Sequence, residues 1–301
     1  MSPQENALQH RRLPEWLKVP MPAGSNFHQL RSLIRDGDLH TVCEEAHCPN
    51  IGDCWDRLTA TFMILGDTCT WRCHYCAVKT GRPSPLDSGE PERLARTVKH
   101  LGLRYVVITS VNRGDLPDGG AAMFAECISR IRHYLPTCKI EVLTPDFRGN
   151  KEALATVLEA RPDVLNHNIE TVKRIFRSVR PQGDYARSLR FLELSSLMAP
   201  DIPTKSGMMV GLGETVDEIR ETMMDLRNSG CHLLTIGQYL RPSLVHFPLE
   251  KYYHPDEFAA LQRYGMRLGF RHVASGPLVR SSYHADEQAA AARIVDLTGS
   301  R

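Results

Sequence analysis

The chain lacks any apolar run long enough to cross a membrane. No stretch of its 301 residues approaches the roughly 18 to 20 apolar residues that a transmembrane helix needs. Residues 1–20 (MSPQENALQHRRLPEWLKVP) also lack the uninterrupted apolar core of a secretory signal. These absences predict a cytoplasmic protein that works without a membrane. They leave open a mature organellar form whose transit peptide has been removed.

An excess of positive charge is absent too. The 37 Lys and Arg residues nearly balance the 35 Asp and Glu residues, so the formal net charge is only +2. Nucleic-acid binders usually carry a broad basic field, and we therefore expect no nucleic-acid partner. Low-complexity tracts and internal repeats are also missing. With 42% hydrophobic residues, the chain fits one large α/β domain with an appended segment.

Cysteines, in contrast, are concentrated. Six of the nine form two local trios: Cys43, Cys48 and Cys54 (the first trio), and Cys69, Cys73 and Cys76 (the second trio). In a chain without secretory features, such concentration favours soft-metal ligands over disulfides. The other three cysteines stand alone in apolar contexts and are predicted to be buried thiols: Cys127, Cys138 and Cys231.

The number of ligands in each trio narrows the choice of metal. A structural zinc site normally has four ligands, and neither trio has a fourth Cys or His at finger spacing. A 4Fe–4S cluster held by three thiolates leaves one iron free to bind another molecule. The trios therefore predict two iron–sulfur clusters. The alternatives are a zinc-stabilised nucleic-acid-binding module and a set of inert buried thiols.

Strand-like and helix-like runs alternate from just before the second trio. The predicted strands are residues 59–65, 105–110, 139–144, 164–169, 204–210 and 233–239. The predicted helices are residues 90–101, 121–134, 150–160, 187–198, 215–229 and 255–268. Such a repeat indicates parallel strands joined by crossover helices.

Polar residues follow most of the predicted strands, which favours a barrel over an open sheet because the strand ends of a barrel share one mouth. These residues are Asn112, Arg113, Asp115, Asp146, Asn168, Glu170, Glu214 and Arg241. We predict an α/β fold with a partial (β/α)6 TIM-type barrel over residues 58–275. An N-terminal extension (1–57) carries the first trio, and it and a C-terminal extension (276–301) close over the barrel mouth.

The second trio, with Tyr75 before its last cysteine, resembles the signature of the radical S-adenosylmethionine (SAM) enzymes, whose open iron binds SAM. Within that superfamily, five further segments resemble the lipoyl synthase family. They are residues 41–51 (TVCEEAHCPNI), 109–120 (TSVNRGDLPDGG), 166–171 (NHNIET), 237–242 (GQYLRP) and 280–284 (RSSYH). The resemblance runs from about residue 8 to 287. Gly114 departs from it, since many relatives are expected to have an acidic residue there.

The resemblance implies a sulfurtransferase that inserts sulfur at C6 and C8 of an octanoyl chain amide-linked to a lysine of a lipoyl carrier domain. Such C–H bonds have no acidic proton, so a radical cofactor is required. The 4Fe–4S cluster on the second trio would give an electron to SAM, and a sacrificial auxiliary 4Fe–4S cluster on the first trio would donate the sulfur. The implied partners are an octanoylated H protein or E2 lipoyl domain, an electron donor such as ferredoxin or flavodoxin, and an iron–sulfur carrier.

The resemblance also implies further site residues. Ser282, or less favourably Ser281, would be the fourth ligand of the auxiliary cluster, although a polar tail is the plainer interpretation of these serines. Residues expected to contact SAM are Asn168, Glu170, Arg180, Gly211, Gly213 and Glu214. The glycine turn is not a dinucleotide fingerprint because residue 216 is Val, and by itself it indicates a tight turn with Thr215 as N-cap.

Arg113, Arg180 and Arg241 each have two interpretations. Each could order a loop or bind SAM, or it could form a structural salt bridge. Another radical SAM sulfur-inserting enzyme is the remaining alternative within the same chemistry. Residues 280–284 and the absence of an added RNA-binding domain count against it.

Overall fold

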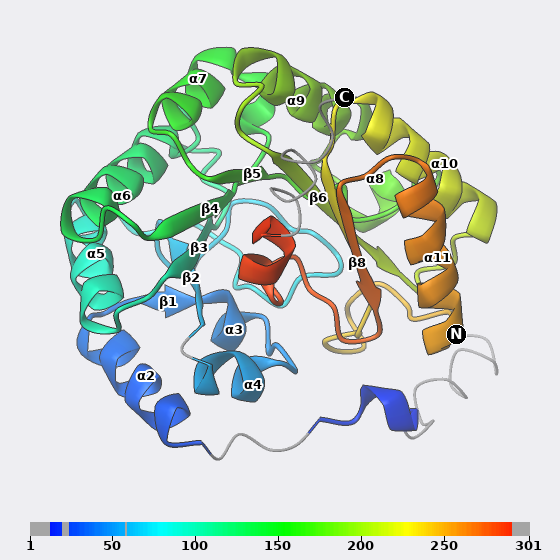
Figure 1. Ribbon diagram of the computed structural model, residues 1–301, viewed down its shortest axis with the longest axis horizontal. Helices are drawn as coiled ribbons and strands as arrows, with labels where there is room; N and C mark the ends of the chain where they lie inside the picture. Colours follow the sequence, from blue (N-terminus) through cyan, green and yellow to red (C-terminus); the bar gives the residue numbers. More distant parts are fainter. Residues whose placement is uncertain (1–12, 20–23, 58, 291–301) are drawn as a thin grey trace.

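The computed structural model describes residues 13–19, 24–57 and 59–290. One eight-stranded sheet curves through the molecule in the order β1 to β8 (Figure 1). Strands β2 to β8 run parallel, and only β1 is antiparallel to its neighbour. The strands are β1 (His40–Thr41), β2 (Thr61–Ile64), β3 (Tyr105–Ser110), β4 (Lys139–Leu143), β5 (Val164–Asn166), β6 (Thr204–Val210), β7 (Leu233–Gln238) and β8 (His272–Gly276). Since β1 and β8 are the two edges, the barrel is not closed.

One long helix follows each parallel strand from β2 to β7, and these helices surround the barrel wall (Figure 1). They are α5 (Glu90–His100), α6 (Ala121–Tyr134), α7 (Lys151–Glu159), α9 (Tyr185–Met198), α10 (Val216–Asn228) and α11 (Pro255–Arg267). Each was predicted from the sequence with its ends within two residues. Capping explains two of the starts: Thr215 forms a capping box with Glu218 at α10, and His254 caps α11 ahead of Pro255.

The core lies between the sheet and these helices. Alternate strand residues such as Ile108 on β3 and Val142 on β4 are fully buried beneath α5 to α7, and Leu234 and Ile236 on β7 lie in a second cluster with α10 and α11. Strand β3 (YVVITS) is buried along nearly its whole length and is accordingly mostly apolar. Cys127, Cys138 and Cys231 are buried in these regions, as predicted.

The predicted α/β partial barrel is confirmed, but the sequence interpretation missed one parallel strand. Strand β8 consists mostly of small residues (HVASG), which give little β signal. The two-residue β1 and the N-terminal helices were missed as well. Those helices are η1 (Glu15–Leu17), α2 (Ser25–Asp36), α3 (Val42–Glu45) and α4 (Ile51–Asp56), and the barrel adds η2 (Phe147–Gly149) and α8 (Phe176–Val179). Among the described residues, no helix has the length and apolar character to span a membrane.

The chain after β8 turns back into the barrel. The Ser281 hydroxyl donates a hydrogen bond to Asn168 Oδ1 (3.0 Å), just beyond β5. A Cβ on Gly207 of β6 would lie within 2.8 Å of both the Asn168 amide oxygen and the Ser281 hydroxyl oxygen, so the missing side chain makes room for this contact. Residues 277–283 therefore lie inside the barrel, against the inner face of the sheet.

The helical residues 285–290 end this segment at the opposite end of the barrel. Ala285 and Ala289 pack against the first residues of three strands, Tyr105, Val164 and Leu233. In Figure 1 this turn of helix lies at the centre of the ring. Residues 1–12 and 291–301 of the two predicted extensions, and residue 58 at the predicted boundary, lie outside the described residues.

Candidate active site

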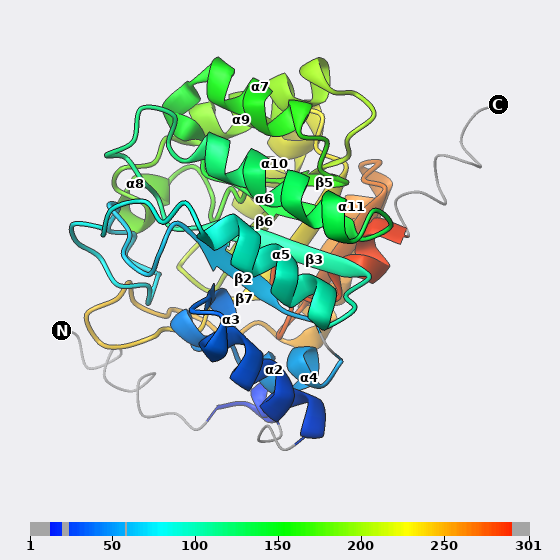
Figure 2. The ribbon, with the colours of Figure 1, turned by 90° about the vertical axis from the view of Figure 1, so that its left-hand side faces the viewer.

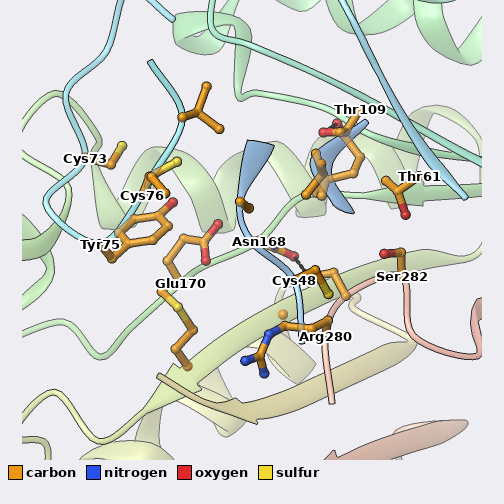
Figure 3. A pocket seen from close by; sticks show the side chains of 18 of the residues that line it. Cys48, Thr61, Cys73, Tyr75, Cys76, Thr109, Asn168, Glu170, Arg280 and Ser282 are labelled. Carbon is orange, nitrogen blue, oxygen red and sulfur yellow. Dashed lines mark hydrogen bonds between the residues drawn. The ribbon is translucent and has the colours of Figure 1, made fainter. Parts of the chain in front are cut away.

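A cavity of about 610 Å³ opens at the carboxyl ends of the strands, and cysteines of both trios line it. Figure 3 shows Cys73, Cys76 and Tyr75 on one side of this cavity and Cys48 and Ser282 on the other. Cys43 and Cys69 also contribute to the wall, whereas Cys54 lies behind it, in α4. The fold therefore brings two sets of residues that are separate in sequence to one enclosed space.

The second trio lies on the long loop that follows β2. Backbone N–H groups of Asn112 and Trp71 donate hydrogen bonds to Cys69 Sγ, at 3.3 and 3.4 Å. The loop is also held from its far side, because His74 N–H donates to Val179 O at 2.9 Å. Donors aimed at a sulfur stabilise negative charge on it, which suits a thiolate ligand.

The first trio spans the short helices α3 and α4, and β1 fixes it to the barrel by pairing with β2. Thr41 caps α3 by accepting a hydrogen bond from Glu44 N–H at 3.3 Å. The Asn50 side chain donates to Leu278 O at 2.6 Å, which joins this segment to the C-terminal segment. Ser282 and Cys48 both line the cavity, on the same side of it in Figure 3.

All six cysteines are free thiols. Burial raises the pKa of Cys43 and of Cys76 to about 11, and that of Cys73 to about 12. Within the described chain, no three His, Cys, Asp or Glu side chains converge closely enough to hold a single metal ion. A 4Fe–4S cluster needs no such convergence, because each thiolate then binds a different iron.

Three of the predicted SAM-contacting residues line the cavity: Asn168, Glu170 and Arg180. Burial raises the pKa of Glu170, while Arg180 and hydrogen bonds from Tyr75 and Asn168 oppose the rise. The Arg180 guanidinium lies over the Trp71 ring, 5.2 Å from its centroid. Its Nε atom is buried and finds no acceptor among the described residues. This arrangement can bind an anionic group.

The other three lie at the end of β6, outside the cavity wall. The carboxylate of Glu214 accepts hydrogen bonds from the backbone N–H groups of Gly211 (2.6 Å) and Leu212 (2.9 Å). A Cβ on Gly211 would lie 2.6 Å from the Lys251 carbonyl oxygen, and its φ of +110° also requires glycine. Chain packing therefore explains this turn, and SAM contact by Gly211, Gly213 and Glu214 stays a prediction.

The arginines after the strands have different environments. Arg113 is buried and pairs with Asp115 at 2.9 Å, which matches the structural interpretation. Arg241 lines the cavity, but its guanidinium donates to the carbonyl oxygens of Leu244 and His246, so it orders its own loop.

Sequence reasoning missed two other cavity residues. Arg280 points into the cavity near Cys48 (Figure 3). Buried His167 lies between Thr144 O (2.8 Å) and Ser188 Oγ (3.1 Å). Both residues lie in segments that resemble the lipoyl synthase family, and that resemblance is the only feature of the sequence that could have identified them.

Comparison with known proteins assigns the chain to a family. A model described as the radical SAM superfamily matches residues 63–226, and one described as the N-terminal domain of lipoyl synthase of the radical SAM family matches residues 2–48. The lipoyl synthase of Rubrobacter xylanophilus is 57% identical over 280 residues, covering 93% of this chain and 87% of that protein. The chain belongs to the lipoyl synthase family. The lipoyl synthase of Shouchella clausii is 54% identical to this chain, and the match covers 98% of this chain and 96% of that protein.

Solved structures agree on the fold. Methylornithine synthase superposes with a TM-score of 0.55 at 12% identity, covering 93% of this chain and 94% of its own. The FeFe-hydrogenase maturase HydG from Carboxydothermus hydrogenoformans superposes with a TM-score of 0.57 at 15% identity, covering 75% and 55%. Membership of the radical SAM superfamily implies a 4Fe–4S cluster and SAM as cofactors of this lipoyl synthase family member.

Proposed function

We propose that this chain is a sulfurtransferase that inserts two sulfur atoms, at C6 and C8, into an octanoyl chain amide-linked to a lysine of a lipoyl carrier domain. The observation that carries the proposal is that cysteines of both trios, all but Cys54, line one cavity of about 610 Å³. A substrate chain in that cavity lies between the two sets of thiols, so hydrogen abstraction and sulfur donation can act on the same carbon.

In this proposal the second trio holds the cluster that binds SAM. Cys69, Cys73 and Cys76 supply three thiolates, and the two backbone donors to Cys69 Sγ stabilise charge there. When bound, the cluster and SAM supply the one-electron chemistry that an unactivated C–H bond requires. The protein's part is to hold the reacting groups in register and to exclude water.

Three cavity residues would position SAM. Arg180 offers the buried Nε donor that lacks an acceptor among the described residues, which suits the carboxylate of SAM. Glu170 is an acceptor for the amino group, and Asn168 lies beside it. Arg180 is buried, and Asn168 and Glu170 are half-buried, which limits the competition of water for these polar contacts.

The first trio would hold the auxiliary 4Fe–4S cluster that serves as sulfur donor. We propose Ser282 rather than Ser281 as the fourth ligand, because the Ser281 hydroxyl already donates to Asn168. A serine oxygen is a harder ligand than a thiolate and suits iron–sulfur chemistry less well. We infer that this weaker ligand is what allows the cluster to give up sulfur.

Two extensions, residues 1–57 and 276–301, would thus carry the ligands of the auxiliary cluster and flank a barrel of residues 58–275. The acyl chain would contact apolar residues of the cavity wall, which include Val42, Met63, Val78, Val111, Leu143 and Met208. The substrate protein would be an octanoylated H protein or E2 lipoyl domain. A ferredoxin or flavodoxin would supply electrons, and an iron–sulfur carrier would rebuild the consumed cluster.

Iron and labile sulfide per chain, after anaerobic reconstitution, test this proposal. We expect about eight of each in the wild type and about four after replacing Cys69, Cys73 and Cys76 with Ala. Conversion of an octanoyl carrier domain to its lipoyl form should require both trios. Zinc without sulfide, or a single cluster in the wild type, would exclude the sulfur-donor mechanism.

A further inference from the structure

Two adjacent apolar side chains project into solvent from the loop between β7 and α11. Leu244 is 65% exposed and Val245 is 90% exposed, and Pro242 beside them is exposed as well. Scattered single apolar residues are normal on a surface, but a contiguous run is a candidate contact site. We call Pro242, Leu244 and Val245 the docking patch.

The loop beneath the docking patch is well ordered by hydrogen bonds. Arg241 donates to Leu244 O (2.6 Å) and to His246 O (3.0 Å), and the Ser243 hydroxyl lies 2.8 Å from His246 Nδ1. The Tyr239 hydroxyl donates to Phe247 O at 2.8 Å. A loop held in this way presents its apolar side chains without a further ordering cost on binding.

The docking patch lies at the rim of the cavity. Arg241 and Pro242 line the cavity wall, so the patch continues directly from it. Phe247 N–H donates to His74 O at 2.7 Å, and His246 Nε2 lies 3.1 Å from Cys76 O. Figure 2 shows this loop at the same end of the barrel as the loop that carries the second trio.

We propose that the docking patch is a contact site for the folded carrier domain that delivers the octanoyl-lysine. The inference rests on the proposed function, because it concerns the substrate of that same cavity. A lysine arm is short compared with a protein domain. An acyl chain that reaches between the two trios therefore brings the surface around its lysine against the rim.

An electron donor is the other protein that must approach this end of the barrel. Electron-transfer encounters are small and weak, so they have little need of a rigid apolar anchor. Buried apolar anchors are typical of interfaces that hold a partner in one orientation. Continuity between the patch and the cavity wall favours the carrier domain for the same reason.

The test compares two substrates with a chemical reductant, dithionite, in place of an electron-donor protein. The substrates are an octanoylated lipoyl carrier domain and a short octanoyl-lysine peptide. For the Leu244→Ser/Val245→Ser variant we expect KM for the carrier domain to rise about tenfold or more, with kcat unchanged. Turnover of the peptide should stay at the wild-type level.

Leu197→Ser is the matched control, because Leu197 is 68% exposed but lies near the carboxyl end of α9, away from the cavity. It should change neither substrate, and Leu244→Met/Val245→Ile should restore the carrier KM. Iron and sulfide content confirms that each variant is loaded.

Three outcomes would overturn the inference. An unchanged carrier KM removes the docking role, and equal losses on both substrates mean that the loop shapes the cavity instead. The same assay is repeated with flavodoxin in place of dithionite. A defect that appears only with flavodoxin assigns the patch to the electron donor. If the fully loaded wild type converts neither substrate, the proposed function itself fails, which is a distinct result.

Discussion

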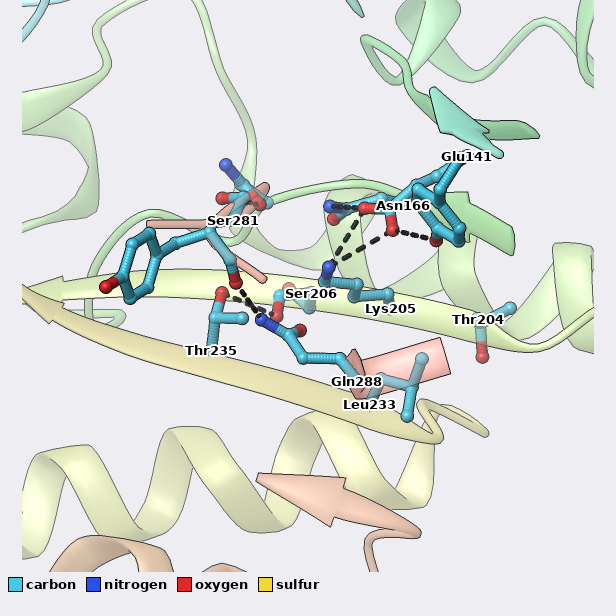
Figure 4. A network of polar contacts seen from close by, with 12 residues as sticks. Glu141, Asn166, Thr204, Lys205, Ser206, Leu233, Thr235, Ser281 and Gln288 are labelled. Atoms are coloured by element: carbon cyan, nitrogen blue, oxygen red, sulfur yellow. Dashed lines mark hydrogen bonds and ion pairs between the residues drawn. The ribbon is translucent and has the colours of Figure 1, made fainter. Parts of the chain in front are cut away.

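Lys205 and Glu141 form an ion pair inside the barrel, below the cavity. Loss of this pair should lower the free energy of unfolding. Lys205 Nζ lies 3.0 and 3.2 Å from the two carboxylate oxygens of Glu141, and the two side chains are 0% and 1% exposed. Tyr105 OH (2.7 Å) and Asn166 Nδ2 (3.0 Å) donate to the same carboxylate (Figure 4). The Glu141 carboxylate is thus contacted by three protein donors, from Lys205, Tyr105 and Asn166.

Lys205→Met removes the cation and leaves the Glu141 carboxylate buried with two neutral donors. Breaking a buried ion pair from one side costs about 3–5 kcal/mol, and the near-complete burial here supports that full range. Glu141→Gln in the same background removes the stranded charge. Its amide can also donate to Asn166 Oδ1, which has no partner in the described chain. We expect the double variant to recover at least half of the loss.

Urea unfolding under anaerobic reducing conditions, at matched cluster content, measures both free energies. The coupling between the two positions follows from a double-mutant cycle with the Glu141→Gln single variant. A loss below about 1 kcal/mol for Lys205→Met would refute the reasoning, since that is typical of a solvent-exposed pair. Strict additivity in the double variant would do the same, because it would mean that the two charges do not stabilise each other.

Three further predictions concern the cavity. Ser282→Cys should keep both clusters, by iron content, but slow the insertion of the second sulfur, and normal rates for both insertions would show that the hard ligand is unimportant. Gly207→Ala places a methyl group within 2.8 Å of Asn168 Oδ1 and Ser281 Oγ, so the free energy of unfolding in urea should fall by about 1–3 kcal/mol. An unchanged free energy would contradict the packing. Burial lowers the pKa of His167 to about 4, so the unfolded chain binds a proton first as pH falls. Stability should decrease between about pH 6.5 and 4, and His167→Gln should flatten that decrease in thermal melts; an unaltered pH profile would place the titration elsewhere.

Local periodicity was sufficient to predict most of the barrel. The helices from α5 to α11 that were predicted have apolar spacing that matches their buried faces, so their bounds agree closely with the structure. Strand β8 was missed because Ala274, Ser275 and Gly276 have weak strand propensity, and it forms only because β7 provides a parallel neighbour. The four-residue α3 depends on the Thr41 cap and on tertiary contacts, which no sequence window contains.

The candidate site was predictable where its residues are close in sequence. The spacing within each trio indicated a metal cluster without any knowledge of the fold. The glycine turn shows the limit of such reasoning, because Gly211 is required by the approach of the Lys251 backbone from 40 residues away. Nothing local distinguishes that requirement from the approach of a ligand. The presence of Ser282 and Cys48 in one cavity is also a long-range result, and only the family resemblance predicted it.

The two extensions of the barrel are joined to each other as well as to the sheet. Asn50 donates to Leu278 O across 228 residues of sequence, and on the outer side Arg57 contacts both His284 and Glu287. A Cβ on Gly237 of β7 would lie 2.1 Å from Val279 O, so the strand itself fixes how deeply the C-terminal segment enters. The position of the proposed serine ligand therefore depends on β7 as well as on the contact with Asn50. The proposed auxiliary ligand set thus combines two segments that are far apart in the sequence, whereas the second trio lies on a single loop.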